Sequence, residues 1–183
     1  MADFPQLVAL RAKVDRSFLY LRFLGNPPSW RRAFFARNVG RYVNPNGRQQ
    51  RNVAMTVKNN LYLNNYTSTV HEIFFQNDDC AYELNAVYHF PRPLYHFIGR
   101  RRENRHFDRI KPQFRDVYPT KKKKDLDNLV KFMMDAFNRS IYHDDSCITK
   151  FIVEKRYDNK GTCDGRFEIT ITKRDTNEVI YID

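Results

Sequence analysis

Segments in which apolar and polar residues alternate strictly constrain the fold of this chain more than any other feature. Residues 166–173 carry Phe167, Ile169 and Ile171 at every second position, with charged or hydroxyl-bearing residues between them. Successive side chains of an extended strand point to opposite faces, so this pattern predicts a strand with one apolar face. Ala81–Phe90 alternates in the same way through Tyr82, Leu84, Ala86 and Tyr88. Strands of this kind need a second layer that covers the apolar face.

Other segments supply the remaining strands and the covering layer. Strands are expected over Ser17–Leu24 and Ile148–Tyr157, and the second is expected to pair antiparallel with Arg166–Lys173 across the intervening turn residues. Helical spacing of apolar residues predicts one helix from about Gly47 to Leu63 and another from about Asp127 to Asn138, where Asn138 is expected to adopt the left-handed conformation. The expected fold class is α+β, a two-layer α/β sandwich with a small mixed sheet and two main helices.

Composition excludes several classes of protein. The chain has 183 residues, 42% of them hydrophobic, which predicts a single domain over residues 1–183. It has no apolar run long enough for a bilayer, acidic Asp3 and Asp15 argue against a signal peptide, and its three cysteines form no CxxC. We therefore expect an intracellular protein without a membrane segment, and neither a secreted nor a disulfide-stapled one.

Positive charge dominates the chain and is concentrated in one stretch. The chain has 32 Lys and Arg against 21 acids, a net charge of +11, which favours a polyanionic partner, most often nucleic acid and less often an anionic membrane. Residues 91–124 contain twelve Lys or Arg and three acids, so twelve minus three, or +9, of the total lies there. This stretch is predicted to be a basic loop inserted in the domain at about 91–124.

Four acidic residues carry the candidate chemistry. Asp125 and Asp127 form a DxD at the start of a predicted helix, and Asp144 and Asp145 precede a predicted strand. Residues two apart in an extended segment point the same way, so Asp125 and Asp127 are expected to converge, with Asp144 or Asp145 joining them. Clustered carboxylates repel unless a cation lies among them, and oxygen ligands without His or Cys favour Mg²⁺, with Mn²⁺ as a substitute. Lys131, one helical turn after Asp127, is placed to neutralise charge developing on a phosphate.

Each of these residues also has a purely structural interpretation. Asp127 would serve as a helix N-cap, with Asp125 favoured by the helix dipole. Asp144 and Asp145 would belong to a solvated turn, and Lys131 to a solvated helix face. The combination of all of them beside four consecutive lysines favours the catalytic interpretation.

The segment from Lys121 to Asp158 resembles the signature of RusA-type Holliday-junction resolvases. The shared pattern is a basic stretch, then DLDN, a lysine one turn later, a DA pair and a DD before a strand. In this chain those parts are Asp125-Leu126-Asp127-Asn128, Lys131, Asp135-Ala136 and Asp144-Asp145. The closing GRFEITIT and, less specifically, Pro27-Pro28-Ser29 with the basic segment and helix that follow are also similar to the family.

The resemblance implies roles for these residues. Asp125, Asp127 and Asp145 would be both the catalytic and the metal-binding carboxylates, with Asp144 as an adjacent acid, and Lys131 would be the catalytic lysine. The implied protein is a homodimer whose paired, Mg²⁺-dependent sites hydrolyse opposite strands of a four-way DNA junction and leave 5′-phosphate and 3′-hydroxyl ends. Such a protein would act in DNA recombination, repair or genome processing.

Basic residues outside the acidic motif are the predicted DNA contacts. They are Arg31, Arg32, Arg37, Arg41, Arg100, Arg101, Arg102, Lys121, Lys122, Lys123 and Lys124. The lysine run is also compatible with a nuclear-import signal. Aromatic residues lie between the basic ones, and they would either stack on unpaired bases or anchor the loop to the domain: Tyr95, Phe97, Phe107, Phe114 and Tyr118.

Two other functions remain open at this point. One is a non-catalytic basic protein that binds nucleic acid, and the other is an endonuclease for flaps or forks. The five histidines show no zinc-site spacing, and no phosphate-binding glycine loop or dinucleotide fingerprint is present, so neither zinc nor a nucleotide cofactor is expected. The protein is expected wherever its DNA lies: the cytoplasm or nucleoid, or the nucleus or a viral factory.

Overall fold

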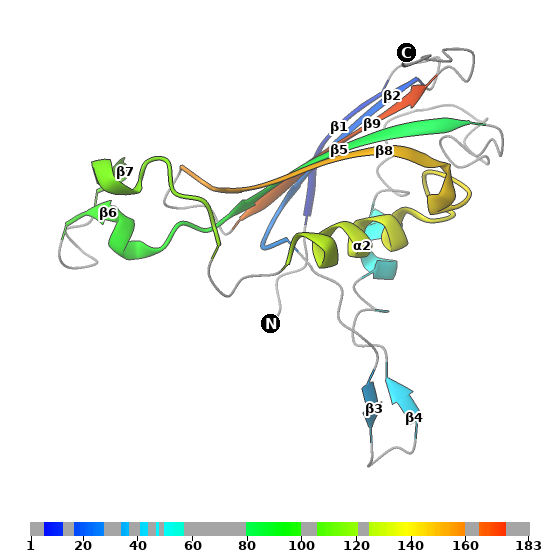
Figure 1. The fold of residues 1–183 in the computed structure, drawn as a ribbon, viewed down its shortest axis with the longest axis horizontal. Coiled ribbons are helices and arrows are strands. Elements are labelled where there is room, and N and C mark those ends of the chain that lie inside the picture. Colours follow the sequence, from blue (N-terminus) through cyan, green and yellow to red (C-terminus); the bar gives the residue numbers. More distant parts are fainter. Residues whose placement is uncertain are drawn as a thin grey trace, which may run out of the picture.

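A five-stranded mixed sheet forms the centre of the molecule (Figure 1). The computed structural model describes residues 6–12, 17–27, 34–36, 41–43, 47, 50–56, 80–99, 106–120, 125–159 and 165–174. The sheet has the order β1-β2-β9-β5-β8. Its strands are β1 (Gln6–Ala12), β2 (Phe18–Leu24), β5 (Ala81–Phe90), β8 (Ile148–Tyr157) and β9 (Arg166–Arg174). The pair β5–β8 is parallel and the other pairs are antiparallel, which confirms the α+β fold with a mixed sheet.

The alternation in the sequence corresponds to one buried and one open face of the sheet. Every second residue of β5 is buried from Tyr82 to Phe90, and β9 alternates in the same way through Phe167, Ile169 and Ile171. The intervening side chains form cross-strand ion pairs, such as Lys150 Nζ to Glu83 Oε2 at 3.1 Å. The strand β1, which was not expected from the sequence, extends the sheet by pairing with β2.

The predicted pairing of β8 with β9 is wrong. Strand β5 lies between them, with Ala86 opposite Val153 of β8 and opposite Ile169 of β9. Strands β8 and β9 do run in opposite directions, but turn residues in the sequence do not determine which strand becomes the neighbour. Strand β8 runs parallel to β5 because the chain, after the end of β5, passes through a helix and re-enters the sheet beside the start of β5. Parallel neighbours need a connection of this kind.

Two helical segments cover the buried face of the sheet (Figure 1). The helix α2 (Leu126–Phe137) buries Leu129, Phe132, Met133, Ala136 and Phe137 against it. The hydroxyl of Tyr88 on β5, which is fully buried, donates to the carbonyl oxygen of Leu129 at 3.2 Å. Residues 50–56 are helical, within the predicted first helix, and Val53 joins the same core. The rest of that predicted helix, residues 48, 49 and 57–63, lies outside the described residues.

A short turn connects α2 to β8. Residue Asn138 has φ −52° and ψ 131°, so it is not the left-handed residue that we predicted. That conformation falls on Arg139 at φ 57°, whose N–H donates to the carbonyl oxygen of Tyr142 at 2.8 Å. The 3-10 helix η3 (Asp145–Cys147) then leads directly into β8.

A small appendage projects beyond the end of the main sheet (Figure 1). We use this name for residues 91–99 and 106–120. It contains η1 (Leu94–His96), β6 (Phe97–Ile98), β7 (His106–Ile110) and η2 (Pro112–Phe114), and β6 pairs antiparallel with β7. The predicted loop at about 91–124 thus contains regular elements, which are too short to produce a periodic sequence pattern. A second small ribbon pairs β3 (Phe34–Ala36) with β4 (Arg41–Val43).

Candidate active site

The carboxylates of Asp125 and Asp127 lie at the N-terminus of α2. Asp125 has extended backbone and occupies the N-cap position, and Asp127 lies in the first turn. The expected DxD is therefore part extended and part helical. The side chain of Asp125 makes no capping hydrogen bond, so capping does not occupy this carboxylate, and the interpretation of Asp127 as the N-cap is wrong. Both residues are exposed.

The same face of α2 continues through Lys131 to Asp135. Residues four apart on a helix are neighbours, so Asp127, Lys131 and Asp135 form one row. Asp135 is half-buried, and Gln50 Nε2 donates to its Oδ2 at 3.3 Å. Burial raises the pKa of the Asp135 carboxyl and the charge of Asp145 adds to this rise, whereas Lys131 and the Gln50 hydrogen bond oppose it. Asp135 therefore lies within electrostatic range of both Lys131 and Asp145.

The two acids that precede β8 differ in their surroundings. Asp144 Oδ1 accepts a hydrogen bond from the Ser146 N–H at 3.0 Å, which is the first cause of the lowered pKa of the Asp144 carboxyl. Asp144 thus caps the turn of η3. Asp145 is half-buried and interacts electrostatically with Asp135 and Tyr142. The turn interpretation therefore describes Asp144, while Asp145 is associated with the end of α2.

Tyr142 holds this turn against the helix. Its buried hydroxyl donates to the carbonyl oxygen of Met134 at 2.9 Å, and burial raises the pKa of the phenol well above its ordinary value. Neither Tyr142 nor Asp135 was among the predicted site residues. The DA pair in the signature and the i+8 position of Asp135 after Asp127 were the signals for Asp135.

The acidic residues form two groups at opposite ends of α2. The helix has 12 residues, so its ends lie about 16 Å apart. Asp125 and Asp127 lie at its start, and Asp145 interacts with Asp135 near its end. Among the described residues, no three His, Cys, Asp or Glu side chains lie close enough together to hold a metal ion. The expected cluster of Asp125, Asp127 and Asp145 is therefore not formed within this single chain.

The exposed pair Asp125 and Asp127 fits a hard divalent cation. Mg²⁺ is usually held by one or two carboxylates, keeps several waters and takes further oxygens from substrate phosphates. Both side chains offer only oxygen ligands and are exposed at the start of α2. In the sequence, four lysines directly precede them. These donors suit Mg²⁺ or Mn²⁺.

Most of the predicted DNA contacts lie outside the described residues. These are Arg31, Arg32, Arg37, Arg100, Arg101, Arg102, Lys121, Lys122, Lys123 and Lys124. Arg41 begins β4, in the ribbon with β3. Phe107 lies in β7.

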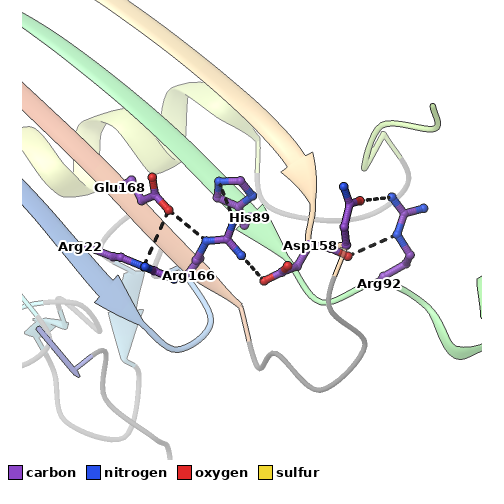
Figure 2. Close-up of polar contacts among 7 residues, drawn as sticks. Arg22, His89, Arg92, Asp158, Arg166 and Glu168 are labelled. Atoms are coloured by element: carbon purple, nitrogen blue, oxygen red, sulfur yellow. Dashed lines mark hydrogen bonds and ion pairs between the residues drawn. The ribbon is translucent and has the colours of Figure 1, made fainter. Parts of the chain in front are cut away.

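An ion-pair network joins the end of the main sheet to the appendage, and no sequence pattern indicated it. Figure 2 shows Arg166 between two acids, Asp158 and Glu168. Asp158 is 1% exposed, and its carboxylate pairs with Arg166 Nη1. The backbone carbonyl of the same residue accepts from Arg92 Nε at 3.3 Å.

Arg92 is the residue that fixes the appendage to the sheet. It is 6% exposed, and its guanidinium donates to the carbonyl oxygen of Phe114 and, at 3.0 Å, to Asn159 Oδ1. The guanidinium carbon also lies 5.3 Å from the centre of the Tyr157 ring. Because these partners belong to η2 and to the end of β8, Arg92 ties two distant parts of the chain together.

The sequence matches the family described as Endodeoxyribonuclease RusA over residues 26–172. This range is well over half of the chain and contains β5, the appendage, α2, η3 and β8. All the acidic residues discussed above lie within it. No curated protein is significantly similar to the chain.

Proposed function

We propose that this chain, which belongs to the RusA family of endodeoxyribonucleases, resolves four-way DNA junctions by metal-dependent hydrolysis of phosphodiesters. One observation carries the proposal: the family match includes the acidic pair Asp125 and Asp127 at the start of α2, and the Asp125 side chain makes no capping hydrogen bond. The net charge of +11 supports DNA as the substrate. The protein would act in recombination, repair or genome processing, in the compartment that holds the DNA.

Asp125, Asp127 and Asp145, with Asp144 adjacent, are the residues that would hold Mg²⁺, and Mn²⁺ would substitute for it. When bound, such a cation polarises the scissile phosphate and lowers the pKa of water. The hydrolysis itself breaks the bond between phosphorus and O3′ after water attacks phosphorus. The products are a 5′-phosphate and a 3′-hydroxyl.

Lys131 is proposed to stabilise the negative charge that develops on the phosphate or the leaving oxygen. Its ammonium lies on the same helix face as Asp127, one turn away, and within electrostatic range of Asp135. Fixed positive charge at this place acts in the transition state without reorganisation. Asp135, which accepts from Gln50, would help to position that ammonium.

A homodimer would complete the site. One chain holds Asp125 and Asp127 at one end of α2 and Asp145 at the other, and no group of three acids forms among its described residues. In a twofold dimer, the start of one α2 can meet the turn of Asp145 from the partner. Such a dimer has two equivalent sites, and two cuts in opposite strands are what junction resolution requires.

Cleavage of a labelled synthetic four-way junction tests the proposal. With Mg²⁺, the native protein is expected to make paired nicks near the crossover, and chelator is expected to abolish them. Asp125→Asn should abolish cutting and leave junction binding intact or stronger, because it removes negative charge beside the phosphates without removing a capping bond.

Linear duplex and a fork serve as the control substrates in this assay. Preferential cutting of the fork would mean that the substrate is forked DNA rather than a four-way junction. Tight binding without cutting in either Mg²⁺ or Mn²⁺ would instead indicate a non-catalytic binding protein. If Asp125→Asn abolished binding, the carboxylate would be structural and the proposed site would be wrong.

A further inference from the structure

The aromatic residues of the appendage fall into two groups. Phe97 is fully buried, and the ring of Phe114 stacks on His96 with centroids 4.2 Å apart. Tyr95 and Tyr118, in contrast, are 60% and 59% exposed. The first group anchors the appendage, and the second remains available to a partner. The anchoring interpretation therefore holds for Phe97 and Phe114, and base stacking stays a prediction for Tyr95 and Tyr118.

The exposed ring of Tyr95 is held in place from behind. It makes T-shaped contacts with the rings of His96 and Phe114 at centroid distances of 4.5 and 5.5 Å. Its carbonyl oxygen accepts a hydrogen bond from Lys111 Nζ at 2.8 Å. A ring fixed in this way loses little conformational freedom when a planar ligand stacks on it.

The second exposed tyrosine lies near the C-terminal end of the appendage in the sequence. Tyr118 precedes Pro119, which is buried, and interacts electrostatically with Arg156 at the end of β8. Arg92 fastens the appendage to the same end of β8 (Figure 2). Both tyrosines therefore belong to one supported unit.

Other exposed apolar side chains accompany the two tyrosines in the appendage, and its sequence is strongly basic. Three further residues of the appendage, Leu94, Ile98 and Val117, are 46%, 41% and 40% exposed. Residues 91–124 meanwhile carry twelve Lys or Arg against three acids, a net +9. Exposed apolar side chains in a segment of such charge are complementary to bases that are attached to a phosphate backbone.

The distance between Tyr118 and the acidic pair has an upper limit set by the chain. Tyr118 precedes Asp125 by seven residues in the sequence. A chain of that length spans at most about 25 Å, which equals the rise of about seven base pairs. One arm of a bound DNA therefore has the length needed to reach both Asp125 and Tyr118.

We propose that Tyr95 and Tyr118 form a stacking platform for unpaired bases of branched DNA. This inference rests on the proposed function, which supplies the branched substrate, and adds the part of the DNA that the appendage recognises. Arg109 and Arg115, which are exposed in the appendage, neutralise the phosphates on either side of the bases. Paired bases in a duplex do not expose their faces, so the platform discriminates in favour of forks and open junctions.

Binding of a fork with single-stranded arms, measured in chelator so that no cutting occurs, tests the platform. One arm carries 2-aminopurine, whose emission falls when it stacks on an aromatic ring. The double variant Tyr95→Ala/Tyr118→Ala should bind the fork at least about fivefold more weakly, since stacking on one aromatic residue contributes at least that factor. Its affinity for blunt duplex should be unchanged, and the quenching of 2-aminopurine should be lost.

Two matched variants separate stacking from general disruption. Tyr95→Phe/Tyr118→Phe retains both rings and should retain fork affinity and quenching. Met55→Ala removes a side chain that is 60% exposed in the helical residues 50–56, and it should change neither. Tyr95→Phe/Tyr118→Phe and Met55→Ala should keep the native Tm, and the alanine double variant, which loses the contacts of Tyr95 with His96 and Phe114, should lower it only slightly.

The outcomes distinguish this inference from the proposed function. Equal affinity of the alanine variant and the native protein for the fork, or equal weakening for fork and duplex, would overturn the platform. If the native protein cuts junctions and the alanine variant has the native fork affinity and quenching, only the platform is wrong. If the native protein cuts nothing but binds forks through the two tyrosines, the platform stands and the proposed function is wrong.

Discussion

Individual histidines at the end of the sheet are held in their neutral form. Burial lowers the pKa of His89, and the neighbouring Arg166 lowers it further. Burial, followed by the charges of Arg92 and Lys111, lowers the pKa of His96, which is 2% exposed. Both rings lie beside the ion-pair network, so a proton on either would meet buried positive charge.

These histidines predict a loss of stability in acid. An unfolded histidine has a pKa of 6.5, and the folded values are lower, so the unfolded state binds more protons once the pH falls below this value. Stability is therefore fully present above about pH 6.5 and decreases as the pH falls through that range. The urea midpoint at about pH 5.5 should be lower than at about pH 7.5.

Substitution identifies the groups responsible for this acid sensitivity. His89→Gln should reduce the difference between the two midpoints, since the residue that takes up the proton is absent. His143→Gln, which changes an exposed histidine in the turn before β8, should leave the difference as it is. An unchanged difference in His89→Gln would show that the acid sensitivity originates elsewhere.

Among the acidic residues, the sequence motif identified the positions but did not separate their roles. Asp144 and Asp145 are adjacent and chemically identical, and nothing in the sequence distinguishes them. The structure distinguishes them because the backbone of η3 directs the Ser146 N–H to Asp144, whereas Asp145 lies near α2. A similar distinction applies to Asp135, whose partner Gln50 is 85 residues away in the chain.

At the scale of elements, the ends of β5, β8 and β9 depend on one buried ion pair. Asp158 is 1% exposed and pairs with Arg166, whose side chain is 18% exposed. Asp158→Asn should lower the free energy of unfolding by about 3 kcal/mol, because removing one partner leaves the other charge buried and incompletely paired. Equilibrium urea unfolding measures this loss.

A surface pair provides the control for this prediction. Glu154→Gln disrupts the contact with Arg156 on β8, where both side chains are substantially exposed to water. Its effect should be much smaller, since exposed pairs contribute little to stability. Equal losses in the two variants would mean that the network in Figure 2 does not stabilise the end of the sheet.

Sequence patterns located the elements better than they located their neighbours. The bounds of β5 follow from its alternation and those of β8 from the turn residues that follow it, and the structure confirms both. The pairing of β8 with β9 was wrong because pairing is decided by which strand occupies the centre of the sheet. The left-handed residue after α2 falls on Arg139 rather than Asn138, because the backbone bond to Tyr142 compensates for the cost.

At the scale of the whole molecule, the separation of the acids along α2 predicts complementation between inactive variants. Alone, Asp125→Asn and Asp145→Asn should each be unable to cut. If each site combines Asp125 and Asp127 of one protomer with Asp145 of the other, a mixed dimer contains one intact site and one doubly altered site. Mixing the two variants under conditions of subunit exchange should therefore restore nicking of single strands, but not paired cuts.

The matched mixture for this experiment is Asp125→Asn with Asp127→Asn, which alter the same end of α2 and leave no intact site in any dimer. This mixture should remain inactive. Restored nicking in both mixtures, or in neither, would contradict a site shared between protomers. In the second case all three carboxylates would have to act within one chain.

None of the helices among the described residues is long and apolar enough to cross a membrane.

Positive charge is the other property of the whole molecule. The net charge of +9 in residues 91–124 follows from the residue types alone. The arrangement of that segment does not follow from residue types. Arg92 becomes buried and contacts Asp158 and Asn159 only because β8 ends beside it.

The sequence by itself determined the class of fold, the apolar faces of β5 and β9, the acidic motif and the family to which it points. These properties depend on the identity and spacing of residues within short segments. Only the tertiary structure decided the strand order, the distance between the two acidic groups, the partners of Arg92 and the division of the aromatic residues. Those depend on contacts between residues far apart in the chain, and the free energy of such contacts is determined by the packing of the whole molecule rather than by any local pattern.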